Sequence, residues 1–186
     1  MGYHVLMMAI FGKSPSVANR EIGFAPINEF HETPASLING TQLPSGAYLL
    51  YLNNVVPQSH YFEKLSLNAT LAACYADEAN GSSIACSWEN GVVKWMVTYD
   101  RSQSDDDFAV LGDFPSQLRT IRDKCMVKQA EARPNVDCFF DLPVELFTSV
   151  GGIHYSACLA TAGNPNPWQV LDKIEAGPQK KWWPFW

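Results

Sequence analysis

The sequence lacks the motifs that mark metal centres and active sites in many other proteins. None of its four histidines belongs to an H-E-x-x-H or Cys/His zinc pattern, and no C-x-x-C pair occurs. The G-x-S-x-G turn of hydrolases and the glycine-rich loops that hold phosphates are also missing. We therefore expect no catalytic residue, no metal site and no bound cofactor. The alternative is a small enzyme whose site is assembled from dispersed His, Cys and Asp side chains in a deep pocket.

A targeting segment and a membrane span are not expected either. Residues 1–4 contain no Lys or Arg, and the apolar run over 3–11 is far shorter than a membrane span, so it predicts a buried strand. A truncated signal peptide is the alternative. The cysteines are odd in number and lie among apolar neighbours, which favours reduced thiols in a cytoplasmic protein over a secreted protein with two bridges. They are Cys74, Cys86, Cys125, Cys138 and Cys158.

Charged residues are few and unevenly distributed. They make up 17% of the 186 residues, and the formal net charge is −6. Residues 1–113 hold 12 acids against 5 bases, whereas residues 114–186 hold 7 acids against 8 bases. Because phosphate recognition needs a basic surface, nucleic acid is not an expected partner. The acidic first part instead suits a basic protein partner, although acidity could also serve solubility alone.

The most informative segment is a β-hairpin predicted over 83–100. Asn90-Gly91 is the preferred pair for a type I′ turn, because both positions need positive φ. A two-residue loop pairs Glu89 with Val92 and Trp88 with Val93. Further along the strands it pairs Cys86 with Trp95 and Ile84 with Val97, which would place the large apolar residues on one face.

The remaining segments complete a predicted α+β fold in one domain, residues 1–186. We expect an antiparallel or mixed β-sheet with the Asn-Gly hairpin at its centre, packed by two or three helices. The segment 12–46 contains four prolines and is predicted to be mostly loop, and 62–78 suits a helix as well as a strand. Further strands are expected at 3–11, 47–53, 136–140 and 153–161, and helices at 115–131, 142–150 and 167–176.

Two of these helices have start signals in the sequence. Asp113 and Asp141 each stand two residues before a proline, where a carboxylate can accept backbone N–H bonds and the proline fits the first turn. In the first of these helices, an apolar stripe is expected to face the core. It consists of Phe114, Leu118, Ile121 and Cys125.

Four segments resemble a group of small bacterial proteins. They are C-S-W-E-N-G-V-V-K-W-M-V-T-Y-D (86–100), L-G-D-F-P with F-D-L-P (111–115, 140–143), and the final K-K-W-W-P-F-W. The group is encoded beside polymorphic or type VI secretion toxins, and its members are regarded as immunity proteins. The resemblance spans at most residues 82–186. It implies a non-catalytic protein that neutralises a cognate toxin domain by protein–protein contact, and it carries over no catalytic residue.

An immunity protein needs a surface complementary in charge to its toxin, and many toxins that attack nucleic acid are basic. The acidic balance of residues 1–113 leads us to predict a partner-binding surface. Its residues are Asp77, Glu78, Asp105, Asp106 and Asp107.

The aromatic tail, residues 180–186, suggests a further possibility. Four of its last five residues are aromatic, so it is expected to dock on the body and bury a large apolar area. If the tail were exposed instead, the protein would be an adaptor module that binds a partner through this segment.

Overall fold

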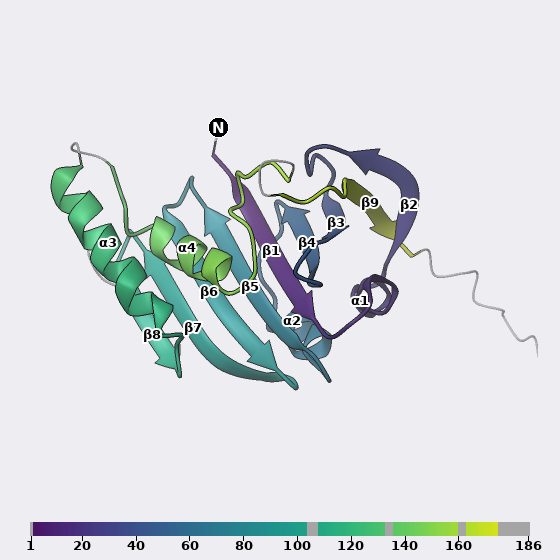
Figure 1. Ribbon diagram of the computed structural model, residues 1–186, viewed down its shortest axis with the longest axis horizontal. Helices are drawn as coiled ribbons and strands as arrows, with labels where there is room; N and C mark the ends of the chain where they lie inside the picture. Colours follow the sequence, from purple (N-terminus) through teal and green to yellow (C-terminus); the bar gives the residue numbers. More distant parts are fainter. Residues whose placement is uncertain (1, 104–107, 133–135, 160–162, 175–186) are drawn as a thin grey trace, which may run out of the picture.

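A computed structural model describes residues 2–103, 108–132, 136–159 and 163–174. In these residues the chain forms an α+β fold with a nine-stranded antiparallel sheet in the order β2-β9-β3-β4-β1-β5-β6-β7-β8, together with four helices (Figure 1). The strands are β1 His4–Phe11, β2 Phe24–His31, β3 Ile38–Gln42, β4 Tyr48–Asn53, β5 Thr70–Asp77, β6 Ser82–Glu89, β7 Val92–Asp100, β8 Phe108–Gly112 and β9 Trp168–Lys173. The helices are α1 Pro15–Ile22, α2 Ser59–Leu65, α3 Gln117–Glu131 and α4 Asp141–Ser149.

Both faces of the sheet carry helices. The front face, toward the viewer in Figure 1, carries α3 and α4, with Phe147 of α4 fully buried among Met7, Leu49 and Val97. The back face carries α1 and α2, and its core includes Leu6, Leu50 and Leu71 together with apolar residues of the two helices. Because successive side chains of a strand point to opposite faces, a strand buried on both sides is an almost continuous apolar run. β1, with six fully buried residues in succession, is such a strand.

β6 and β7 are antiparallel neighbours joined at Asn90 and Gly91, whose φ angles are +52° and +79°. Glu89 pairs with Val92 and Trp88 with Val93, as the turn chemistry predicts. Beyond these two pairs the register shifts by one residue at an irregularity beside Lys94, a β-bulge in β7. The predicted pairs of Cys86 with Trp95 and of Ile84 with Val97 are therefore wrong.

The shifted register distributes the apolar side chains over both faces. Ser87 pairs with Trp95 and Ala85 with Val97. As a result, Trp95 packs in the front core, whereas Trp88 packs in the back core. The hairpin is not at the centre of the sheet, since β1 holds that position and β6 and β7 lie toward the β8 edge.

The helix predicted at 167–176 is wrong, because Trp168–Lys173 forms β9 between β2 and β3. Trp168 faces the front core and Leu171 the back core, so these residues, three apart, do not share a helix face. Residues 136–140 and 153–159 contain no strand. The segment 12–46 is also not mostly loop, since it contains α1, β2 and β3.

The prolines of that segment occupy positions that regular structure tolerates. Pro15 is the first residue of α1, where its missing N–H has no helical partner to lose. Pro26 lies in β2, an edge strand of the sheet. The ambiguous segment 62–78 divides between α2 and β5.

The helices predicted at 115–131 and 142–150 are α3 and α4, each starting within two residues of the expected position. Neither has a side-chain hydrogen bond at its N-cap. Instead, Asp137 accepts hydrogen bonds from the backbone N–H groups of Phe139 and Phe140 just before α4. Leu118 and Cys125 of the expected α3 stripe are buried, but Phe114 is 39% exposed.

Two predictions fall outside the described residues. These are the docking of the tail, 180–186, and the positions of Asp105, Asp106 and Asp107. None of the helices in the described part is long and apolar enough to cross a lipid bilayer.

Candidate partner-binding site

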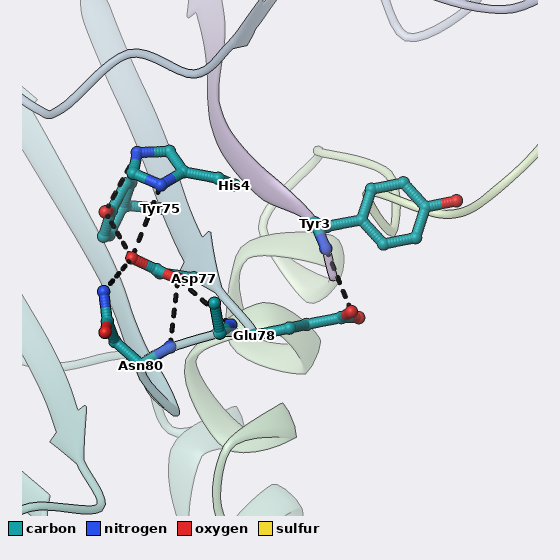
Figure 2. Close-up of polar contacts among 7 residues, drawn as sticks. Tyr3, His4, Tyr75, Asp77, Glu78 and Asn80 are labelled. Atoms are coloured by element: carbon teal, nitrogen blue, oxygen red, sulfur yellow. Dashed lines mark hydrogen bonds and ion pairs between the residues drawn. The ribbon is translucent and has the colours of Figure 1, made fainter. Parts of the chain in front are cut away.

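Asp77 is the last residue of β5, and its carboxylate is buried, with 2% of the residue exposed. One oxygen, Oδ1, accepts hydrogen bonds from the backbone N–H groups of Ala79 and Asn80, both at 3.1 Å. The other, Oδ2, accepts from the Asn80 amide at 2.7 Å and from the Tyr75 hydroxyl at 3.2 Å. His4 Nδ1 lies 3.4 Å from the same oxygen (Figure 2). The side chain is therefore occupied in holding the β5–β6 turn.

These contacts also determine the charge of Asp77. Burial by itself would raise the pKa of the carboxyl group, but the hydrogen bonds from Asn80 and Tyr75 and the neighbouring His4 outweigh burial and lower it. In return, burial and the Asp77 charge raise the pKa of the Tyr75 hydroxyl. Asp77 is thus a buried, ionised structural group. Its predicted role in direct partner contact does not agree with its burial.

Glu78 is exposed and points away from Asp77 (Figure 2). Oε2 accepts a hydrogen bond from the backbone N–H of Tyr3 at 3.0 Å, and Oε1 accepts one from the Tyr155 hydroxyl at 2.8 Å. The Glu78 backbone N–H donates to the Tyr3 carbonyl in addition. These bonds fix the direction of the carboxylate without burying it, so Glu78 can contact a partner.

A second acidic turn lies beside this one. The backbone N–H of Arg101 donates to the Gly81 carbonyl at 3.1 Å, which joins the end of β7 to the β5–β6 turn. Asp100 Oδ1 accepts from the Ser102 N–H at 2.9 Å and from its hydroxyl at 2.7 Å, and Oδ2 accepts from the Gln103 amide at 3.2 Å. The Ser102 bonds, followed by the weaker Gln103 bond, lower the pKa of Asp100. Asp100 therefore stays ionised at neutral pH.

Asp100 is not among the residues predicted for the partner-binding surface. Its signal was the Asp-x-Ser spacing, in which an aspartate accepts from the backbone N–H two residues later. Of the predicted acids, the described residues place Glu78 near this turn, and Asp105–Asp107 follow Gln103 closely in sequence. The candidate site, called the acidic end below, consists of Glu78 and Asp100 in the described part of the chain.

The titratable side chains of the described residues do not gather into a metal site. His31 pairs with Glu29, His60 contacts the Tyr61 ring, and His154 hydrogen bonds to Ser156. Four of the five cysteines are buried, whereas Cys158 is exposed. Burial raises the pKa of the Cys86 thiol to about 12 and that of Cys125 to about 11, which keeps both protonated at neutral pH.

Comparison with protein-family models, with curated proteins and with solved structures finds no match for this chain.

Proposed function

We propose that this protein is an immunity protein, a non-catalytic binding protein that neutralises a cognate bacterial toxin domain by direct contact. The partner is a basic toxin domain, and the encounter takes place in the cytoplasm of a cell that carries a type VI or polymorphic toxin system. The resemblance of the Trp-rich hairpin segment and the two helix starts to immunity proteins is the origin of this proposal.

The acidic end is the observation that carries the proposal. Two turns that are distant in sequence lie side by side, and each presents a carboxylate that hydrogen bonds hold in place. Asp105, Asp106 and Asp107 add three further negative charges within a few residues of Asp100 in sequence, against one positive charge in the same segment, Arg101. A concentration of one sign of charge raises the association rate with an oppositely charged protein, which helps an inhibitor reach a toxin before it acts.

The scaffold behind the acidic end also suits an inhibitor. Asp77 holds the β5–β6 turn by bonds to Ala79 and Asn80, and Tyr155 holds Glu78. A surface that is already ordered loses little conformational entropy on binding, so more of its contact energy contributes to affinity.

The test uses the protein encoded beside this chain, purified as a domain made inactive by substitution. We expect binding in the nanomolar range by calorimetry, with protection of cells that express the active domain. Absence of both binding and protection contradicts the proposed function.

The role of the acidic residues is tested by association kinetics at several salt concentrations. Replacing Asp105, Asp106 and Asp107 with Asn is expected to slow association about tenfold at low salt and to flatten its salt dependence. The matched control removes three exposed charges elsewhere, through Glu63→Gln, Glu131→Gln and Asp172→Asn. If both triple variants change the kinetics equally, net charge alone acts and these aspartates are not a contact surface.

A further inference from the structure

The back face of β7 and β8 is open, in contrast to the rest of that face. The helices α1 and α2 contribute to the back core with β1, β4 and β5, and α2 reaches β6. Beyond this point the sheet is uncovered in the described part of the chain. Leu111 of β8 is 57% exposed, Ala109 is exposed, and Met96 and Thr98 of β7 are partly exposed.

A hollow of about 570 Å³ lies on this open face at the acidic end, within the range of volumes that accommodate ligands. Ile84 and Thr98 pair across β6 and β7, and Thr98 pairs with Ala109 of β8, so the three share the back face. Next to them, Ser82 pairs with Asp100. Gln103 also lines the hollow, together with Tyr99 and Phe108, a pair that packs in the front core.

Asp100 is the one formally charged residue in that described lining. Its Oδ1 accepts two hydrogen bonds from Ser102, whereas among the described residues Oδ2 accepts one, from Gln103. A carboxylate has about four lone-pair positions in total, so Oδ2 can accept one more donor. The hollow thus combines hydroxyl, amide and apolar wall groups with one anionic acceptor, which suits the aliphatic stem and cationic head of an Arg or Lys side chain.

We propose that the open back face of β7 and β8 is the surface on which the toxin docks, with the hollow receiving one of its basic side chains. This inference rests on the proposed function and adds the position of the interface. Charge complementarity indicates a basic occupant, because Asp100 lies in the lining of the hollow and the chain as a whole carries a net charge of −6. Leu111 and Met96 then supply the apolar contact beside the charged one.

The first experiment tests the hollow without the toxin. N-acetyl-L-arginine amide is titrated into the ¹⁵N-labelled full chain, and N-acetyl-L-citrulline amide serves as a neutral probe of the same shape. We expect saturable shifts of the Thr98, Asp100 and Ala109 amides with the arginine probe only, at least fivefold weaker binding in Asp100→Asn, and no weakening in Asp172→Asn. Equal shifts with citrulline, or shifts scattered over the surface, overturn the assignment of the hollow.

The second experiment tests the face with the inactive toxin domain. Leu111→Glu is expected to weaken binding at least tenfold, whereas Val127→Glu, at a 59% exposed position on the outer side of α3, leaves it unchanged. Circular dichroism and the melting temperature verify that both variants fold. If wild type binds the toxin and both variants bind equally, the inferred interface is wrong while the proposed function stands. If wild type does not bind, the function itself fails.

The oligomeric state gives a further outcome. Analytical ultracentrifugation of the full chain is expected to show a monomer for both wild type and Leu111→Glu. A wild-type dimer that Leu111→Glu dissociates would show that a second copy of this chain occupies the face, and it would overturn the inference.

Discussion

Replacing Asp77 tests the conclusion that its carboxylate is a structural group. In Asp77→Ala the N–H groups of Ala79 and Asn80, the Asn80 amide and the Tyr75 hydroxyl all lose their acceptor. Asp77→Asn keeps one oxygen for the two backbone donors but places an NH₂ group toward the remaining partners. The two variants therefore remove different parts of the same cluster.

The expected loss follows from the number and environment of these bonds. A hydrogen bond to a charged group contributes about 1.5–3 kcal/mol, and losing one partner of a buried charge costs about 3–5 kcal/mol. Ala79 and Asn80 are exposed, so water replaces part of what they lose. We expect Asp77→Ala to lower the free energy of unfolding by about 3 kcal/mol and Asp77→Asn by about half of that. For a chain of this size, about 3 kcal/mol corresponds to about 6–12 °C in melting temperature.

The effect also depends on pH, with a sign fixed by the pKa. The pKa of Asp77 is lower in the folded state than the value of about 3.9 expected when unfolded. Its stabilising contribution is therefore complete above about pH 4 and is lost as the pH falls through the folded pKa. The difference in stability between wild type and Asp77→Asn should shrink as the pH falls below about 4.

Urea unfolding followed by tryptophan fluorescence measures these differences, since the chain has six tryptophans. Asp172→Ala is the control, because Asp172 is exposed at the end of β9 and should change stability by less than about 0.5 kcal/mol. A loss below about 1 kcal/mol in Asp77→Ala, or a wild-type advantage that persists unchanged at pH 3, would refute the reasoning.

Three further outcomes are expected. Gly40→Ala should lower stability by about 2–3 kcal/mol, because a Cβ there would overlap the Tyr48 ring and hydroxyl, and a neutral result in thermal melts would contradict this close approach. Ser83→Ala should cost about 1 kcal/mol in urea unfolding, since the buried Ser83 hydroxyl donates to the Phe140 carbonyl at 2.7 Å, and no measurable loss would show that this bond contributes nothing. In native buffer, a thiol-reactive reagent should label Cys158 first and the buried cysteines only on unfolding, as mass spectrometry of the labelled peptides would show.

Local chemistry made part of the fold predictable. Asn90-Gly91 defines the turn and the two pairs beside it, because both depend only on adjacent residues. The bulge beside Lys94 allows Trp95 and Trp88 to pack in different cores, one on each face of the sheet. Because the presence of two cores depends on the whole sheet, the hairpin sequence alone does not predict the bulge. The predicted register placed the large apolar residues of the hairpin on one face without a bulge, so it agrees with the structure only in the two pairs beside the turn.

β9 is a clearer case in which local sequence signals do not determine the structure. The proline before Trp168 and the three-residue spacing to Leu171 favour a helix locally, but pairing with β2 and β3 decides the structure. Those partners lie far away in the sequence, where a search for periodicity does not reach. The candidate site shows the same limit. Glu78 and Asp77 are adjacent in sequence, yet one is an exposed carboxylate and the other a buried one, and only tertiary contacts distinguish them.

The insertion of β9 between β2 and β3 has a consequence for synthesis. The ribosome produces β2 and β3 long before β9. This part of the sheet therefore cannot form until β9, the strand that pairs with both, has been synthesised. During that interval β3 exposes unpaired backbone groups along one side, where another nascent chain could add and start aggregation. Chaperones that bind extended apolar segments would protect the chain at this stage. The need for these chaperones should fall once residues 168–173 have emerged and can pair with β2 and β3.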